Sequence, residues 1–259
     1  MRKVLVIGIG VGDPEHLTVQ AINAMNEVDV FFVMDKGGAE HDLVQIRKKI
    51  CERYITDRSY RIVEARDPER DRSAAEYEAA VDGWYDARAD VYENLIAEEL
   101  DDDGCGAFLV WGDPSLYDGT LRVIERVRAR GRASFDLDVI PGITSVQVLA
   151  ARHRISLSGV GESIQITTGR RLAAAGLPPG VDNVVVMLDG GCSFSGVAED
   201  GVEIYWGAYL GTDDEMLEAG TLSERSTDIE HARADARSRK GWIMDTYVLR
   251  RPAGSAGAS

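Results

Sequence analysis

The chain contains the stretch Phe108-Leu-Val-Trp-Gly-Asp-Pro-Ser-Leu-Tyr-Asp-Gly119, an apolar run that ends in a Gly-Asp-Pro turn and leads into a helical pattern. Two similar strand-to-glycine turns accompany it, one at Val6-Ile-Gly-Ile-Gly-Val-Gly-Asp-Pro14 and one at Val139-Ile-Pro-Gly-Ile-Thr-Ser145. Glycine has no side chain, so it tolerates unusual backbone dihedrals and lets the backbone come close to another group. The three turns therefore predict that several strand ends meet around one small ligand.

Strand-like and helical patterns alternate along the first part of the chain. The expected strands cover residues 3–9, 30–34, 60–65, 107–111 and 135–140, and the expected helices cover 17–28, 41–54, 73–100 and 121–130. Such alternation is typical of a mostly parallel sheet with helices on both faces. We therefore expect an N-terminal α/β domain over residues 1–141.

The pattern changes after Pro141-Gly142. Expected strands at 163–167, 183–188, 202–208 and 242–249 are accompanied by expected helices at 144–151 and 224–240. They predict a second, smaller α/β domain with a mixed sheet over residues 142–252. The expected ligand site is the cleft between the two domains, which the three glycine turns border. The small and polar tail 253–259 is expected to be disordered.

Two charged segments are expected at the surface. In the helix 41–54, Leu43 and Ile46 share one face, and Arg47 lies largely on the other. The loop Arg66-Asp-Pro-Glu-Arg-Asp-Arg72 is interpreted as a mobile loop that could serve as a lid.

The composition excludes several classes of protein. The 259 residues are 44% hydrophobic and 28% charged, which is typical of a globular protein with a sizeable core. The formal net charge of −15 argues against nucleic acid or an anionic membrane surface as a partner. No apolar run approaches the roughly 20 residues of a membrane span. The first expected strand begins at Lys3, which leaves no room for a signal peptide, so we expect a cytoplasmic location.

The three cysteines, Cys51, Cys105 and Cys192, lie far apart and lack the spacing of metal ligands. They are expected to be free thiols of a reducing compartment, and no metal site is expected.

The first turn, Gly8-Ile-Gly-Val-Gly12, has part of a dinucleotide-binding fingerprint, and Asp35 ends the second expected strand, where a ribose-binding acid would stand. The fingerprint requires a glycine at position 13, where this chain has Asp13. An acid there is unfavourable beside a pyrophosphate, so a ligand without phosphates is favoured. A nicotinamide-dependent oxidoreductase remains an alternative.

Beyond the three turns, several segments give the chain a resemblance to the tetrapyrrole methylases. They are Met34-Asp-Lys-Gly37, Asp42-Leu43, Arg47, Asp67-Pro-Glu-Arg-Asp-Arg72, Ala151-Arg-His-Arg154, Thr167-Thr-Gly-Arg-Arg171, Val186-Met-Leu-Asp-Gly190, Tyr205-Trp-Gly-Ala-Tyr-Leu-Gly211 and Gly241-Trp-Ile-Met-Asp-Thr-Tyr247. One departure is Val11, where the family usually has proline. The resemblance implies a two-domain α/β fold, a homodimer, and transfer of a methyl group from S-adenosylmethionine to a tetrapyrrole.

Within the family, the resemblance is strongest to members that methylate and deacetylate precorrin-5, a ring-contracted corrin precursor, and release acetate. The implied cofactor-binding positions are Gly10, Val11, Gly12, Trp111, Gly112, Asp113, Leu116, Thr144, Ser145, Leu188 and Ala208. For Leu188 and Ala208, core packing is the alternative. The substrate carries many carboxylates, for which Arg152, Arg154, Arg170 and Arg171 are the expected partners. These arginines could instead cap helices or pair with surface acids.

Loss of the acetyl group requires a base that activates water and donors for an oxyanion. The candidates are Asp35, Asp113, Tyr117 and His153, and His153 could equally belong to an ordinary surface. Two further alternatives stay open at this point. The protein could be a sibling methylase that acts on another precursor, or a carrier that binds a tetrapyrrole without turnover.

Overall fold

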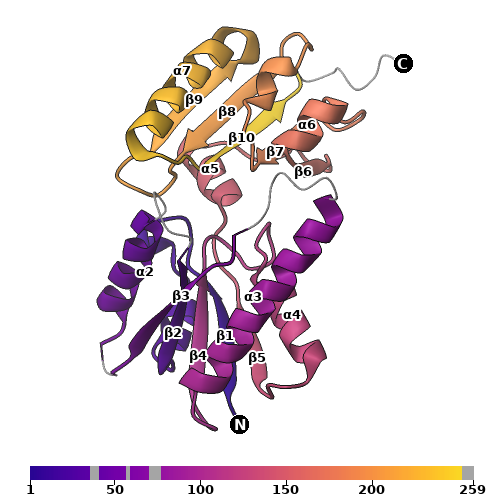
Figure 1. Ribbon diagram of the computed structural model, residues 1–259. Coiled ribbons are helices and arrows are strands. Elements are labelled where there is room, and N and C mark those ends of the chain that lie inside the picture. The colour runs from indigo at the N-terminus through magenta and orange to yellow at the C-terminus, as the bar shows by residue number, and fades with distance from the viewer. Residues whose placement is uncertain (36–40, 57–58, 70–76, 253–259) are drawn as a thin grey trace. The chain divides into compact units, whose positions relative to one another are not determined.

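The structure is a computed structural model that describes residues 1–35, 41–56, 59–69 and 77–252. The chain divides into two compact units, Met1–Thr144 and Ser145–Ser259 (Figure 1). The predicted mobile segment 70–72 and the predicted disordered tail 253–259 lie outside the described residues.

The first unit is built on a five-stranded sheet with the order β3-β2-β4-β1-β5, and every strand pairs in parallel with its neighbours. Its strands are β1 (Lys3–Gly8), β2 (Val30–Asp35), β3 (Arg61–Arg66), β4 (Cys105–Val110) and β5 (Asp136–Ile140). Its helices are η1 (Pro14–His16), α1 (Val19–Met25), α2 (His41–Tyr54), α3 (Tyr77–Glu99) and α4 (Thr120–Arg130). The predicted parallel α/β sheet is confirmed.

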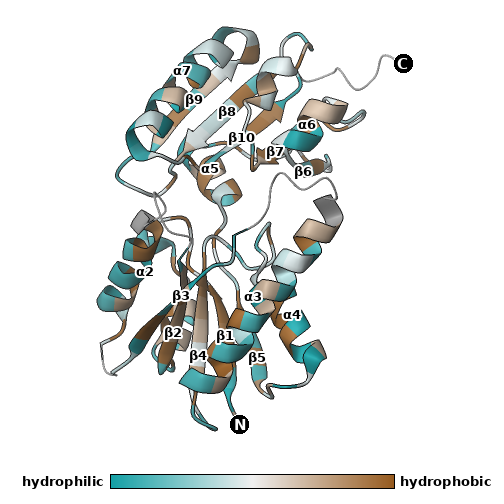
Figure 2. Cartoon of the chain, in the orientation of Figure 1, coloured by the Kyte–Doolittle hydropathy of each residue, from teal (hydrophilic) through white to brown (hydrophobic). Residues whose placement is uncertain are grey.

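Two apolar cores cover the two faces of this sheet. On one face, Phe108 of β4 stacks on Tyr92 of α3 with ring centroids 4.2 Å apart, and Val123 of α4 joins this core. On the other face, Ile7 of β1 packs with Met25 of α1 and with residues of α2. Figure 2 shows hydrophobic residues along the strands and hydrophilic residues on the outer sides of the covering helices. Burial on both faces explains the continuous apolar runs of the central strands.

The second unit has a mixed five-stranded sheet with the order β6-β7-β10-β8-β9, in which only β6 and β7 pair in parallel. Its strands are β6 (Ile164–Thr168), β7 (Asn183–Met187), β8 (Glu203–Ala208), β9 (Met216–Thr221) and β10 (Asp245–Arg250). Its helices are α5 (Ser145–His153), α6 (Gly169–Ala175), η3 (Ser193–Gly196) and α7 (Leu222–Lys240). Helices α6 and α7 contribute to one apolar core, whereas α5 packs on the opposite face, where Leu149 lies against Gly207.

Several local predictions need correction. The strand β9 and the helix α6 were not expected, because their short sequences carry no clear period. Thr18 caps α1, and Asp13 caps the short helix η1 that precedes it. Arg47 is not on a solvent face, since its Nε donates to the carbonyl of Leu109 at 3.1 Å. Asp67 is not part of an exposed loop, because only 5% of its surface is exposed.

Candidate functional site

The carboxyl ends of β1 and β4 form the topological switch point of the parallel sheet. From β1 the chain crosses to β2 on one side, and from β4 it crosses to β5 on the other side. In open α/β sheets, ligands bind outside the strand ends at such a point. The predicted glycine turns after β1, β4 and β5 are therefore at the position where a ligand is expected.

The three turns contact one another through glycine backbone. A Cβ atom on Gly142 would lie 2.2 Å from the carbonyl oxygen of Gly112 and 2.8 Å from the Cα of Gly8. A Cβ atom on Gly8 would lie 2.6 Å from the nitrogen of Gly142. Any side chain would force these strand ends apart. The close approach explains the glycines at positions 8 and 142, whereas at position 112 the φ of 69° favours glycine.

A backbone bridge joins the first and second turns. The nitrogen of Gly112 donates to the carbonyl of Gly10 at 2.7 Å, and Gly10 adopts a φ of 73°, which favours glycine. Helix α1 begins only at Val19, eleven residues after β1 ends at Gly8. A dinucleotide fingerprint instead places a helix N-terminus directly at the glycines. The first turn therefore lacks the geometry that the nicotinamide alternative requires.

The carboxylate of Asp113 ties the second turn to the third. One oxygen accepts from the nitrogen and the hydroxyl of Ser115, and the other accepts from the nitrogen of Gly142 at 2.8 Å. Partial burial acts to raise the pKa of Asp113, but the hydrogen bonds from Ser115 and Gly142 outweigh it and lower the pKa. Asp113 is thus ionised and engaged in holding two loops.

The remaining predicted cofactor positions divide between the two units. In the first unit, Val11 and Thr144 are buried, and Trp111 and Leu116 are half-buried in the turn that carries Gly112. In the second unit, the hydroxyl of Ser145 is 2.9 Å from the hydroxyl of Thr246 in β10.

Leu188 and Ala208 differ in exposure. Leu188, directly after β7, is 65% exposed and has a φ of 53°, an unusual conformation for a residue with a side chain. Core packing is therefore excluded for Leu188. Ala208 ends β8 and is fully buried, as the core-packing alternative requires.

His153 is held by backbone. Its Nε2 lies 2.9 Å from the carbonyl of Trp206, and its ring meets that of Tyr205 edge-on at 5.6 Å. A carbonyl can only accept, so Nε2 carries the proton and donates it in this contact.

The four predicted substrate arginines lie in the second unit. Arg152 pairs with Glu215 at 2.9 Å, which agrees with the surface-pair alternative. Arg154 is exposed and has a φ of 56°. Arg170 and Arg171 are exposed in the first turn of α6, which Thr168 caps.

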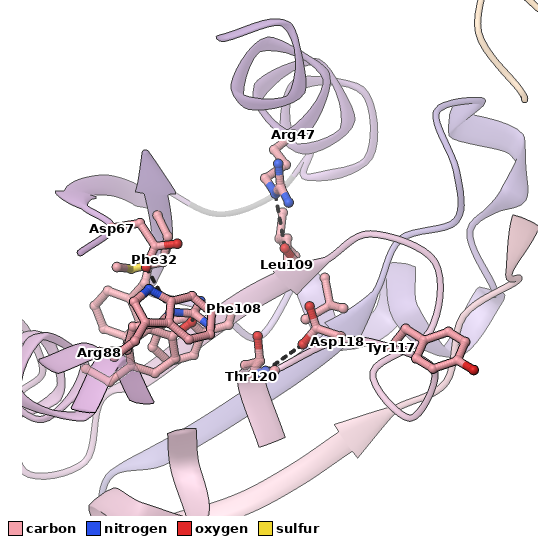
Figure 3. A pocket seen from close by; sticks show the side chains of 14 residues that line it. Phe32, Arg47, Asp67, Arg88, Phe108, Leu109, Tyr117, Asp118 and Thr120 are labelled. Atoms are coloured by element: carbon pink, nitrogen blue, oxygen red, sulfur yellow. Dashed lines mark hydrogen bonds and ion pairs between the residues drawn. The ribbon is translucent and has the colours of Figure 1, made fainter. Parts of the chain in front are cut away.

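The first unit also contains a cavity of about 240 Å³ that the sequence did not predict (Figure 3). Of the predicted positions, only Tyr117 lines it, and Tyr117 is 45% exposed with a φ of 53°. The cavity is lined by Phe32, Met34, Arg47, Asp67, Trp84, Arg88, Tyr92, Phe108, Leu109, Val110, Tyr117, Asp118, Gly119 and Thr120. Asp35 ends β2, one residue after Met34 of this lining. A sequence signal was present, because Trp84, Arg88 and Tyr92 follow one another at the four-residue spacing of a helix face.

The model of the Tetrapyrrole (Corrin/Porphyrin) Methylases family matches residues 3–225. The chain belongs to the tetrapyrrole methylase family. The chain is 51% identical to the precorrin-6A synthase [deacetylating] of Sinorhizobium sp over 253 residues, which cover 98% of this chain and 97% of that protein.

Solved structures agree with this assignment. A putative cobalamin synthesis related protein (CobF) from Corynebacterium diphtheriae superposes with a TM-score of 0.80 and 40% identity, over 96% of this tetrapyrrole methylase and 98% of that chain. A uroporphyrin-III C-methyltransferase from Thermus thermophilus, complexed with S-adenyl homocysteine, has a TM-score of 0.57 and 14% identity over 96% and 92% of the two chains. At that identity, the likeness concerns the fold alone. The two-domain α/β fold expected of a tetrapyrrole methylase agrees with the two observed units, one with a parallel sheet and one with a mixed sheet.

No group of three or more His, Cys, Asp or Glu side chains in the described ranges could hold a metal ion. Among the helices of this part of the chain, none is long and apolar enough to span a bilayer. The cysteines are free, and burial raises the pKa of the Cys51 thiol to about 12.

Proposed function

We propose that the protein is an S-adenosylmethionine-dependent C-methyltransferase that methylates and deacetylates precorrin-5. The products would be precorrin-6A and acetate, in aerobic cobalamin biosynthesis. The observation that carries this proposal is the 51% identity to the Sinorhizobium enzyme over almost the whole of both chains. A sibling methylase with another substrate would share the fold, but not an identity of this extent.

The glycine turns fit the cofactor of this family. S-adenosylmethionine has no phosphates, so it needs backbone donors and acceptors more than an anion-binding helix end. Close contacts at Gly8 and Gly142 leave no space for side chains at these strand ends, so backbone borders the switch point there. We assign cofactor binding to the turns around Gly10–Gly12, Trp111–Leu116 and Thr144–Ser145, with Leu188 as a further contact.

The cofactor, when bound, supplies a methyl group that its sulfonium has already activated. The protein therefore has to align the substrate and exclude water, and it needs no nucleophilic side chain. Asp113 contributes by holding the second and third turns together. We propose a positioning role for Asp113 in place of proton transfer, because its lowered pKa makes it a weak base.

Deacetylation has a separate requirement. The oxygen of water bonds to the acetyl carbon, the bond to the ring carbon breaks with its electron pair left on the ring, and a base takes the water proton. Of the four candidates, His153 donates Nε2–H to a carbonyl and Asp113 is engaged by three donors. We favour Asp35 and Tyr117 for this step, because Tyr117 lines the cavity of the first unit and Asp35 directly follows Met34 of its lining. Asp35 would accept the proton, and the Tyr117 hydroxyl would donate to the oxyanion.

An assay of both products tests the proposed function. Wild-type protein, precorrin-5 and methyl-labelled S-adenosylmethionine are expected to give equal amounts of S-adenosylhomocysteine, methylated corrin and free acetate. Methylation without acetate would assign the protein to a sibling activity. Binding without turnover would indicate a carrier.

Arg170 and Arg171 are expected to bind substrate carboxylates. Replacing both with alanine should raise the dissociation constant for precorrin-5 about tenfold or more, because charged hydrogen bonds are lost. The affinity for S-adenosylhomocysteine, measured by calorimetry, should stay nearly unchanged. Arg225→Ala is the matched control, since Arg225 is also exposed in the second unit and pairs with Asp228. An equal loss of affinity for precorrin-5 and for S-adenosylhomocysteine in the double variant would contradict the assignment.

We further propose a homodimer, as the resemblance to the family implies, and a cytoplasmic location, as the sequence pattern predicts. Light scattering coupled to gel filtration measures the oligomeric state directly. A monomeric mass would overturn the dimer without affecting the proposed reaction.

A further inference from the structure

The cavity of the first unit contains a buried cation whose hydrogen-bonding capacity is only partly used. Arg88 of α3 is 8% exposed, and Asp67, directly after β3, is 5% exposed. The Nε atom of Arg88 lies 2.8 Å from Oδ1 of Asp67, so the two form a buried ion pair. Neither atom is aligned for a hydrogen bond. Figure 3 shows Arg88 and Asp67 together on one side of the cavity.

The other nitrogens of Arg88 differ in their contacts. Nη2 donates to the hydroxyl of Tyr92 at 3.0 Å. Nη1, with two N–H groups, makes no hydrogen bond to any of the residues that the structure describes. Unlike Nε, Nη1 is not one of the fully buried unpaired atoms of the described residues, so it is open to the cavity that Arg88 lines. An acceptor that enters the cavity can therefore accept from Nη1.

The walls around Arg88 fix the guanidinium in place. The guanidinium carbon, Cζ of Arg88, lies 4.9 Å from the ring centre of Trp84 and 5.4 Å from that of Tyr92. Arg47 enters the same cavity from α2 and donates to the carbonyls of Leu43 and Leu109. Both guanidiniums are thus held by packing and hydrogen bonds, which favours recognition of a planar anion.

We propose that this cavity binds one carboxylate-bearing side chain of the tetrapyrrole, with Arg88 Nη1 as the donor. The assignment rests on the proposed function and adds a substrate-binding position in the first unit. A cavity of about 240 Å³ accommodates an acetate or propionate arm, and the aromatic walls cover its methylene groups. The cavity lining includes Tyr117, one residue after Leu116 in the turn assigned to the cofactor. An arm anchored there would hold the ring beside the cofactor positions.

The test measures the dissociation constant for precorrin-5 in the presence of S-adenosylhomocysteine, so that binding is observed without turnover. Arg88→Gln is expected to raise this constant about tenfold or more, and Arg88→Lys to raise it less. The affinity for S-adenosylhomocysteine alone should stay unchanged. Arg126→Gln is the control, because Arg126 pairs with Asp86 of α3 outside the cavity.

A second variant keeps the ion pair intact. Gly119 lines the cavity with a φ of −96°, a conformation that alanine adopts readily. A Cβ atom there would lie 3.2 Å from Arg88 Nη1 and cover it from the cavity side. Gly119→Ala should therefore weaken precorrin-5 binding in the same direction, even if Arg88→Gln proves too unstable to measure.

The outcomes separate this assignment from the proposed function. Active wild-type enzyme with unchanged precorrin-5 affinity in Gly119→Ala, or in folded Arg88→Gln, overturns the cavity assignment alone. Wild-type enzyme that neither binds nor converts precorrin-5 overturns both. A third outcome is that sodium acetate binds the wild type but not the Arg88 variant, while both bind precorrin-5 equally well. This result would assign the cavity to released acetate and overturn its use by a substrate arm.

Discussion

The Gly142→Ala variant is expected to lose detectable binding of S-adenosylhomocysteine and to show a free energy of unfolding lower by about 1–3 kcal/mol. The added Cβ would lie 2.2 Å from the carbonyl oxygen of Gly112 and 2.8 Å from the Cα of Gly8. Both neighbours are backbone atoms at strand ends, so the turns themselves have to move. Calorimetry measures the binding, and denaturant unfolding measures the stability.

The matched control for this variant is Gly83→Ala. Gly83 lies inside helix α3, and a Cβ there would meet no atom within 4 Å. Alanine is favoured over glycine in a helix by about 1 kcal/mol, so this variant should be slightly more stable and bind the cofactor normally. Retention of wild-type affinity by Gly142→Ala would contradict the assignment of the glycine turns to the cofactor.

The Arg233→Met variant is expected to lower the free energy of unfolding by about 3–5 kcal/mol. Arg233 of α7 is 7% exposed, and its Nε donates to Asp245 Oδ2 at 2.9 Å. It also donates through Nη2 to the carbonyl of Asp189. Removing Arg233 leaves the buried Asp245 carboxylate without its positive partner. Chemical denaturation at neutral pH measures the loss.

The same variant should show a characteristic pH dependence. Burial already raises the pKa of Asp245, and Arg233 opposes this rise. Without Arg233, the pKa of the folded state moves further above that of the unfolded state. A carboxyl group whose pKa is higher in the folded state than in the unfolded state stabilises the fold in acid. This stabilisation is lost as the pH rises through the folded-state pKa. The defect should therefore be smaller near about pH 5 than near about pH 8.

Two further variants test whether the charge is the cause. Arg233→Met combined with Asp245→Asn should recover part of the lost stability, since no unpaired charge remains. Arg237→Met, an exposed substitution in the same helix, should change the stability by less than about 0.5 kcal/mol. Equal destabilisation of the single and double variants would point to lost packing instead of an unpaired charge.

Much of the fold could be predicted from local patterns. The strands β1, β2 and β4 are continuous apolar runs, because they are buried on both faces of a parallel sheet. The helix α2 was predicted with its observed limits, His41 and Tyr54. The second unit was harder, since β9 has the sequence Met-Leu-Glu-Ala-Gly-Thr, in which no alternation of polar and apolar residues is visible.

The candidate site was predicted unevenly for a physical reason. Glycine turns reveal themselves in sequence, because backbone contact excludes every other residue type. Buried charges cannot be recognised from sequence in this way. Asp67 resembles any residue of a charged loop and Arg88 any residue of a long helix, and only the structure shows their ion pair. The network that joins Arg233, Asp245 and Asp189 was missed in the same way. Residues 189 and 245 are separated by 56 positions, and only folding brings them together.

The contact between Gly8, Gly112 and Gly142 also limits how this enzyme could be redesigned. A clash between side chains can be relieved by a second substitution. Here the obstructing atoms belong to the backbone, which no amino-acid substitution removes. Laboratory evolution toward other tetrapyrroles should accordingly retain Gly8 and Gly142 and accumulate its accepted changes elsewhere.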